Sequence, residues 1–150
     1  MELQLALDRI EKKRAIDIVE SLKDLIDIVE IGTPFSIMQP IEIINDFKKI
    51  SPCLRVLADY KIMDGGYALA EIAYKAGADI VTVSAQTWDE TILQTIQAAR
   101  DYGKQVLVDM MGIKEEDIAE RGKQMTTCIQ TTFVRIGLFL LTERQVLKKL

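Results

Sequence analysis

The stretch VLADYKIMDGG, residues 56–66, joins an apolar run directly to a set of charges. Three apolar residues lead into Asp59, and Lys61 and Asp64 follow before two glycines. Because side chains alternate along an extended chain, Asp59 and Lys61 are expected on the same side. A lysine between two carboxylates stays protonated and keeps the carboxylates ionised. The stretch therefore predicts a buried strand that ends in a functional group of charges.

Working outward from this strand, short apolar runs alternate with helical patterns along the chain. The candidate strands are 3–7, 27–32, 54–58, 79–83 and 105–110. The candidate helices, with apolar residues three to four positions apart, are 11–25, 40–50, 67–77, 88–103 and 114–125. Strands this apolar are typical of a parallel sheet that is covered by helices on its faces. The alternation therefore predicts an α/β fold.

Acids at the strand ends bear on the choice between an open doubly wound sheet and a (β/α)8 barrel. Asp8, Asp59 and Asp109 are expected at the ends of three strands, and Glu30 lies within a fourth. In a barrel all of these ends lie on one rim, where the chemistry takes place, so these four acids and Asp64 would converge there with Lys61. No G-x-G-x-x-G sequence follows the first strand, which weakens a dinucleotide-binding interpretation.

Each acid also has a purely structural interpretation. An Asp at the end of a strand is often a helix cap or a turn residue, and this alternative stays open for Asp8 and Asp109. Glu30 lies between apolar neighbours inside a strand, and a buried carboxylate needs a partner or a metal ion. The functional interpretation is therefore favoured for Glu30 and for the group around Lys61.

Composition excludes several classes of function. The net charge of −4 argues against a nucleic-acid-binding protein, which would show a basic face. The chain contains no histidine, which excludes Ser-His-Asp and Cys-His catalysis and histidine metal ligation within it. Acid–base chemistry is therefore left to Asp, Glu, Lys or Tyr.

The cellular compartment is expected to be the cytoplasm. Cys53 and Cys128 lie far apart and outside any C-x-x-C pattern, as in a reduced protein. Residues 1–10 lack a basic start followed by a long apolar segment, so we expect no signal peptide. The apolar run at 137–141 is too short to span a membrane.

Several motifs together resemble one family. ADYKIMDGG resembles the Asp-x-Lys-x-x-Asp motif of the orotidine 5′-phosphate decarboxylase superfamily. LQLALD, DIVEIGTP, GADIVTV and VLVDMMGI resemble its 3-hexulose-6-phosphate synthase branch in order and spacing, from residue 1 to about residue 125. The resemblance implies a (β/α)8 TIM-barrel fold. A full barrel needs roughly 200–250 residues, so a chain of 150 residues is expected to contain only about five to six βα units.

The resemblance also implies roles for individual residues. Glu30 and Asp59 are expected to bind a Mg²⁺ (or Mn²⁺) ion, since two carboxylates plus substrate and water oxygens suit that ion. Lys61 is expected to stabilise an enediolate oxygen and to relay a proton. Asp64 is expected to reach the active site of a neighbouring subunit, which implies a homodimer with shared sites.

Two further acids take their roles from the same resemblance. Asp8 is expected to contact substrate hydroxyls and Lys61, and Asp109 to lie near the reacting centre. The implied reaction is an aldol condensation of formaldehyde with ribulose 5-phosphate, part of the ribulose monophosphate pathway. One alternative is 3-keto-L-gulonate-6-phosphate decarboxylase, which forms the same kind of enediolate, or another decarboxylase of the superfamily such as orotidine 5′-phosphate decarboxylase. A second alternative is an inactive remnant.

The last 25 or so residues depart from the family pattern, which places a histidine on its sixth strand and a phosphate site in later glycine-rich loops. Residues 126–150 contain neither feature, so no phosphate-binding residues are visible. We expect a partial barrel domain over 1–125 and an atypical tail over 126–150, with a strand near 128–137 and an amphipathic helix near 141–150. The change near Met125 suggests a truncated or frameshifted product, or a diverged short relative.

Overall fold

Strands and helices alternate throughout the computed structural model, which describes residues 2–128 and 134–137. The strands are β1 (Gln4–Leu7), β2 (Ile28–Ile31), β3 (Arg55–Ile62), β4 (Ile80–Ser84), β5 (Gln105–Asp109) and β6 (Val134–Gly137). The helices are α1 (Lys12–Leu22), α2 (Thr33–Met38), α3 (Ile43–Ile50), α4 (Gly66–Lys75), α5 (Asp89–Tyr102) and α6 (Glu115–Cys128).

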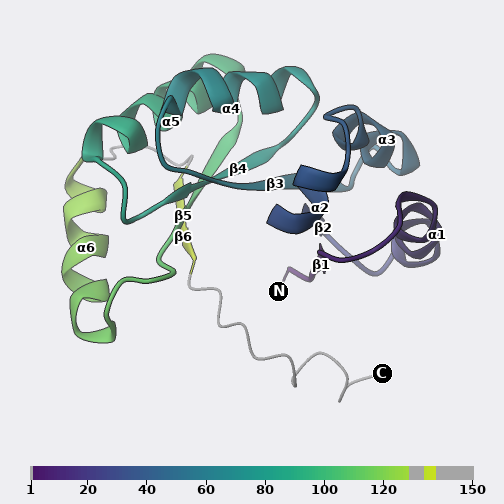
Figure 1. The fold of residues 1–150 in the computed structure, drawn as a ribbon, viewed down its shortest axis with the longest axis horizontal. Helices are drawn as coiled ribbons and strands as arrows, with labels where there is room; N and C mark the ends of the chain where they lie inside the picture. Colours follow the sequence, from purple (N-terminus) through teal and green to yellow (C-terminus); the bar gives the residue numbers. More distant parts are fainter. Residues whose placement is uncertain (1, 129–133, 138–150) are drawn as a thin grey trace.

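The order of the strands decides between the two α/β architectures. All of the strand pairs are parallel, and the strands lie side by side in the order β1-β2-β3-β4-β5-β6. A doubly wound sheet reverses its order at a switch point, whereas a barrel adds each strand beside the previous one. The sequential order confirms the barrel prediction. Figure 1 shows the helices following one another around the outside of the strands, from α1 past α4 and α5 to α6.

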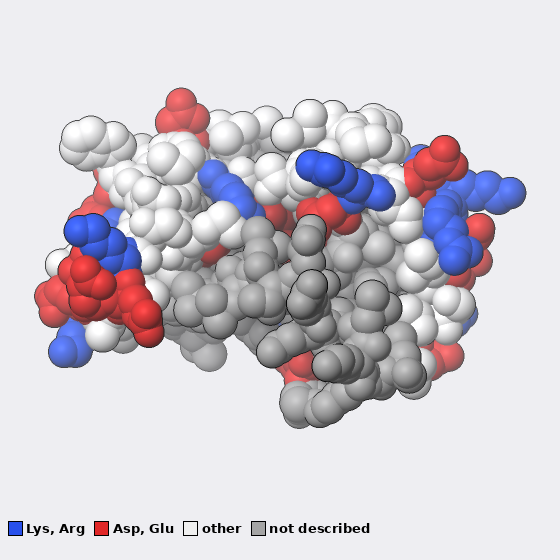
Figure 2. Space-filling model, turned by 60° about the horizontal axis from the view of Figure 1, so that its bottom comes forward, with Lys and Arg blue, Asp and Glu red and all other residues white. Residues whose placement is uncertain are grey.

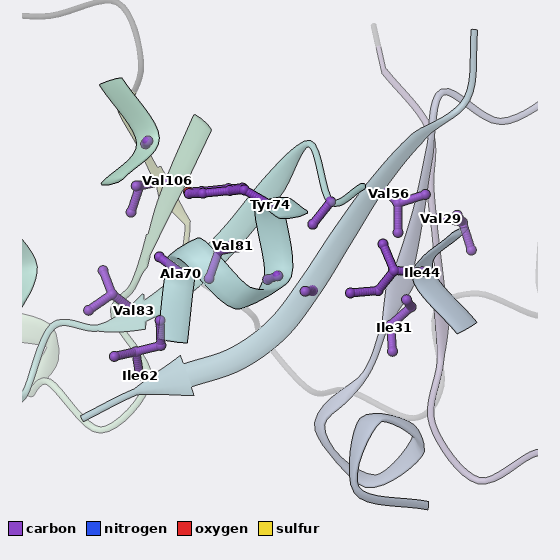
Figure 3. Packing of buried hydrophobic residues seen from close by; sticks show 14 of the residues in the cluster. Val29, Ile31, Ile44, Val56, Ile62, Ala70, Tyr74, Val81, Val83 and Val106 are labelled. Atoms are coloured by element: carbon purple, nitrogen blue, oxygen red, sulfur yellow. The ribbon is translucent and has the colours of Figure 1, made fainter. Parts of the chain in front are cut away.

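The outer face of the sheet packs against these helices and forms the main hydrophobic core. Figure 3 shows Ile44 of α3 beside Val56 of β3, and Ala70 of α4 near Val81 of β4. These side chains are fully buried. Burying apolar surface in this way contributes about 25 cal/mol per Å², so this face supplies most of the driving force for folding.

The inner face carries a second, smaller apolar layer. One residue from each of four neighbouring strands contributes to it, and these are Ile28, Leu57, Ile80 and Leu107. Because side chains alternate along a strand, they point away from the helices and into the barrel interior. Layers of this kind fill the interior of (β/α)8 barrels, so the fold has a packed centre beneath its rim.

The observed β3 is longer than the predicted strand 54–58. It continues through Asp59 and Lys61 to Ile62, so Asp59 lies inside the strand and the prediction that it ends there is wrong. The apolar pattern stops at Ala58 because the next inward-facing position belongs to a polar layer. The pairing of β3 with β4 also changes register between Ala58 and Ile62.

One other element, α2, differs from the sequence prediction. The sequence predicts only a break at Gly32 and Pro34, but a helix of six residues, α2, begins there with proline in its first turn. β6, which pairs with β5, confirms the strand expected near 128–137. The amphipathic helix expected near 141–150 lies outside the described residues.

Glycines allow α4 and α5 to form where the sequence predicts them. Gly103 adopts a left-handed conformation, with φ of 63°, and ends α5. A Cβ atom on Gly66 would lie 2.2 Å from the carbonyl oxygen of Thr91 in α5. The two helices therefore pack closely only because residue 66 has no side chain.

Charged side chains form mixed clusters on the surface. Figure 2 shows acidic and basic side chains adjoining one another over one face of the molecule. At the amino-terminal end of β4, Asp79 accepts hydrogen bonds from Lys48 Nζ (2.7 Å) and Lys104 Nζ (2.8 Å). Burial opposes ionisation of Asp79, but these two ammonium groups and the Val56 N–H outweigh it and lower its pKa. The network ties α3, β3 and β4 together at the end of the sheet opposite the rim.

Candidate active site

A polar layer lies above the inner apolar layer, two residues further along each of the same four strands. Its members are Glu30, Asp59, Thr82 and Asp109. All four are nearly inaccessible to water, with exposed fractions between 0% and 5%. Buried polar groups require partners. Thr82 bonds to Asp59, Lys61 pairs with Asp59 and Asp109, and Glu30 accepts from Gln4. The four strands therefore present a ring of oxygen atoms near the carboxyl ends of the sheet.

Lys61 is the cation of this layer. Its Nζ atom lies 2.5 Å from Oδ2 of Asp59 and 3.4 Å from Oδ2 of Asp109. Burial disfavours the ammonium, but the hydrogen bonds and charges of the two carboxylates outweigh that effect and raise the pKa of Lys61. Lys61 is therefore protonated at neutral pH, as the sequence predicts. Its contact with Asp109 of β5 was not predicted, because Asp64 was expected as the second acid.

The backbone at Lys61 is unusual. Its φ of 45° makes it the one residue other than glycine with a positive φ among those described. A left-handed conformation costs a residue with a side chain roughly 1–2 kcal/mol. It lies in the stretch where the β3–β4 register shifts, and such bulges occur next to active sites, where they redirect a side chain.

Hydroxyl groups hold the Asp59 carboxylate on both of its oxygen atoms. Thr33 donates to Oδ2 at 2.7 Å, and Thr82 donates to Oδ1 at 2.9 Å. Lys61 donates to Oδ2 as well. Hydrogen bonds of this kind stabilise the ionised form of a carboxylate and fix its orientation. The Asp59 carboxylate is thus oriented by three donors at the centre of the polar layer.

Glu30 is a buried acid of the layer whose pKa is raised. Burial is the main cause that raises its pKa to about 7, and the nearby charge of Asp59 adds to this effect. A hydrogen bond from Gln4 Nε2 to Oε2, 2.5 Å long, and the charge of Lys61 act in the opposite direction. Glu30 and Asp59 therefore form a pair of close carboxylates that repel each other.

These features match those of a known family. The model of the Orotidine 5'-phosphate decarboxylase / HUMPS family matches residues 1–136. The chain belongs to this family. The match extends beyond residue 125, where the sequence resemblance was expected to end, and includes most of β6.

Members of the Orotidine 5'-phosphate decarboxylase / HUMPS family include close relatives of the chain. The 3-hexulose-6-phosphate synthase of Bacillus subtilis (strain 168) is 45% identical over 126 residues, which are 83% of this chain and 59% of that protein. The solved 3-hexulose-6-phosphate synthase from Salmonella typhimurium is 41% identical, with a TM-score of 0.81, over 85% of this chain and 59% of that one. The chain thus spans about three fifths of the length of these relatives.

A more distant solved structure shares the fold. KGPDC from Streptococcus mutans is 25% identical, with a TM-score of 0.74, over 83% of this chain and 60% of that one. Together with the strand order, these similarities show that the chain has an α/β fold of the (β/α)8-barrel family. The chain covers only part of a complete barrel. No helix within the described residues is long and apolar enough to cross a membrane.

Two of the acids expected in the family site, Asp8 and Asp64, are exposed and lie at its edge. Asp8 directly follows β1, is exposed, and raises the pKa of Glu30 slightly through its charge. Its Oδ1 atom would lie 2.2 Å from a Cβ on Gly32, so only glycine leaves it room. Asp64 lies in the exposed turn between β3 and α4. Asp109 belongs to the polar layer itself: its Oδ1 accepts from the Met111 N–H in a turn, and its Oδ2 faces Lys61. Its role near the reacting centre stays a prediction.

Glu30 and Asp59 could supply the carboxylate ligands of a Mg²⁺ ion. Mg²⁺ is commonly held by one or two carboxylates, with waters and substrate oxygens as its other ligands. A divalent cation near the pair would offset both the repulsion and the burial that raise the pKa of Glu30. Within 2–128 and 134–137, no group of three or more His, Cys, Asp or Glu could hold a metal ion, so other ligands would be needed.

Sequence reasoning missed Thr82, Thr33 and Gln4, which hold the acids in place. A signal for Thr82 is present in the four strands, which share a triplet of two apolar residues followed by a polar one. The triplets are Ile-Val-Glu at 28–30, Leu-Ala-Asp at 57–59, Ile-Val-Thr at 80–82 and Leu-Val-Asp at 107–109. Aligning them places Thr82 in the same layer as the three acids.

Proposed function

We propose that the chain carries the enediolate-stabilising part of a 3-hexulose-6-phosphate synthase-type active site, which joins formaldehyde to ribulose 5-phosphate. The observation that carries the proposal is the ammonium of Lys61, held between the buried carboxylates of Asp59 and Asp109 on the rim of a parallel barrel. The 41–45% identity to two proteins named 3-hexulose-6-phosphate synthase supports this choice of reaction.

The residues suit the charge changes of an aldol condensation. Removing a proton next to the carbonyl of ribulose 5-phosphate leaves an enediolate, with negative charge on neighbouring oxygen atoms. The fixed ammonium of Lys61 stabilises that charge, and it costs no reorganisation because the two aspartates already orient it. Since Lys61 is itself protonated, a carboxylate of the layer accepts the proton. The enediolate carbon then forms a bond to formaldehyde, whose oxygen takes up a proton.

A Mg²⁺ ion (Mn²⁺ being the alternative) is the proposed cofactor, held by Glu30 and Asp59. When bound, it would act as a Lewis acid toward the substrate oxygens. The support is that two buried carboxylates lie close enough for their charges to interact, since burial and then the charge of Asp59 raise the pKa of Glu30.

The synthase reaction is preferred to decarboxylation because of the relatives. The enediolate chemistry of the polar layer serves both reactions, so the layer alone does not separate them. The compared KGPDC is 25% identical, well below the two synthases.

An aldol assay on the full 150-residue chain tests the proposal. We expect Mg²⁺-dependent consumption of formaldehyde in the presence of ribulose 5-phosphate, with the appearance of a hexulose 6-phosphate. Release of CO₂ from 3-keto-L-gulonate 6-phosphate without consumption of formaldehyde would replace the synthase by the decarboxylase. Absence of both reactions in a folded chain would support the inactive remnant and contradict the proposal.

We further propose that the partner is a second copy of this chain, which would bring its Asp64 to the shared site. The proposal is supported by the exposure of Asp64 to solvent. Two apolar side chains that follow the carboxyl ends of β3 and β4 are also exposed, Met63 (53%) and Trp88 (82%). Association would bury such side chains. Sedimentation should give twice the 17.0 kDa of the chain, and a mass that stays at 17.0 kDa at all concentrations would contradict the dimer.

A further inference from the structure

The pairing of β3 with β4 contains a bulge, in which several residues of β3 lie opposite a single residue of β4, Thr82. Ala58 pairs with Val81 and Ile62 pairs with Val83, so residues 59–61 of β3 lie opposite Thr82 alone. Asp59 and Lys61 both belong to this three-residue bulge. The residue that faces the bulge is therefore placed to determine its shape.

The hydroxyl group of Thr82 contacts both charged residues of the bulge. Its Oγ1 atom accepts a hydrogen bond from the backbone N–H of Lys61 at 2.8 Å. The same hydroxyl donates its proton to Oδ1 of Asp59 at 2.9 Å. Thr82 has an exposed fraction of 0%, so water does not replace either bond easily. Thr33, in contrast, contacts Asp59 but has no such bond to the Lys61 backbone.

We propose that Thr82 is a positioning residue, whose hydroxyl fixes the left-handed backbone of Lys61 and the carboxylate of Asp59 relative to each other. One hydroxyl accepts from one partner and donates to the other, so it sets both ends of the contact between Lys61 Nζ and Asp59 Oδ2. This role deepens the proposed function and rests on it for its catalytic consequence. The positioning itself depends only on the geometry of the bulge.

Hydrogen exchange of the Lys61 amide in the full ¹⁵N-labelled chain measures the positioning directly. Thr82→Val removes the hydroxyl and keeps the branched shape, and should increase exchange at Lys61 by about tenfold, as expected for one lost hydrogen bond. Thr82→Ser keeps the hydroxyl and should restore exchange close to that of the unaltered chain. Thr82→Cys, with its weaker hydrogen bonding, should give an intermediate rate and serves if the valine variant does not fold.

Thr95→Val is the matched control. Thr95 is also fully buried, but its hydroxyl donates to the Thr91 carbonyl within α5, and the change should leave exchange at Lys61 unaltered. The proposal would be overturned if Thr82→Val left Lys61 exchange unchanged, if Thr82→Ser behaved like Thr82→Val, or if Thr95→Val had the same effect at Lys61.

Steady-state kinetics separates the positioning role from the proposed function. In Thr82→Val we expect kcat to fall by roughly 10–100-fold with little change in KM, because misplacing a stabilising cation affects the transition state most. Thr82→Ser should recover most of kcat. If the unaltered chain shows no turnover while Lys61 exchange still responds to Thr82→Val, the proposed function fails and the positioning role stands.

Discussion

Replacing Lys61 by methionine is expected to lower kcat/KM for the aldol reaction by roughly a hundred- to a thousandfold, the scale seen when a preorganised stabilising group is removed. Lys61 supplies the cation of the polar layer, and methionine has a similar length without the charge. Lys61→Arg restores the charge but should recover little activity, because a planar guanidinium does not fit a site shaped for an ammonium between Asp59 and Asp109.

A matched control separates this effect from a general loss of positive charge. Lys75→Met removes a lysine of α4 that pairs with Glu71 outside the polar layer, and should leave kcat/KM within about twofold, as is usual for surface changes. Circular dichroism must confirm that each variant is folded, since Lys61→Met leaves two buried carboxylates without their cation. Turnover by folded Lys61→Met equal to that of the unaltered chain would remove Lys61 from the mechanism.

The fold could be predicted from the sequence because its signals are local and repeated. The alternation of apolar strands with amphipathic helices specifies an α/β fold without any knowledge of distant contacts. The choice of a barrel needed more, namely the assumption that the acids at the strand ends and Asp64 converge. Lys61 lies between Asp59 of β3 and Asp109 of β5, and Glu30 of β2 interacts with the charge of Asp59. These three acids therefore share one buried layer.

The conformation at Lys61 could not be predicted, because it results from pairing between strands. Period-two alternation puts Lys61 on the side of Asp59, as observed, but it does not reveal that three residues of β3 face Thr82 alone. Nothing in the local sequence marks a left-handed lysine, since that conformation is ordinarily reserved for glycine or asparagine. The contact with Asp109 is equally non-local, as it joins β3 to β5.

Helix α2 was not predicted, for a different reason. A helix of six residues completes fewer than two turns, so its apolar residues show no clear period. Gly32 and Pro34 were therefore interpreted only as a break after β2, although proline is favoured in the first turn of a helix. The element matters for the site because its first residue, Thr33, donates to the Asp59 carboxylate.

Replacing Glu30 by glutamine is expected to remove a pH-dependent loss of stability. In the folded chain the pKa of Glu30 is raised from 4.5 to about 7. Between these values the unfolded chain releases a proton that the folded chain retains, so the free energy of unfolding falls as the pH rises. The loss is complete above pH 7 and amounts to about 2–3 kcal/mol between pH 5 and pH 8.

Urea unfolding at pH 5 and pH 8 measures this difference. Glu30→Gln cannot release a proton, so it should lose less stability over this range than the unaltered chain. Its free energy of unfolding should also exceed that of the unaltered chain at pH 8. Glu116→Gln, at an exposed position of α6, is the matched control and should follow the unaltered chain. Parallel pH dependence of Glu30→Gln and the unaltered chain would contradict a raised pKa at this residue.

Adding Mg²⁺ extends the same experiment to the proposed metal site. A ligand that binds only the folded chain stabilises it, by about 2.7 kcal/mol at a hundred times its Kd. Because binding competes with protonation of Glu30, Mg²⁺ should stabilise the unaltered chain more at pH 8 than at pH 5. Glu30→Gln retains only Asp59 of the carboxylate pair, so the same Mg²⁺ concentration should stabilise it far less. Equal stabilisation of both proteins would place Mg²⁺ elsewhere and exclude Glu30 as a ligand.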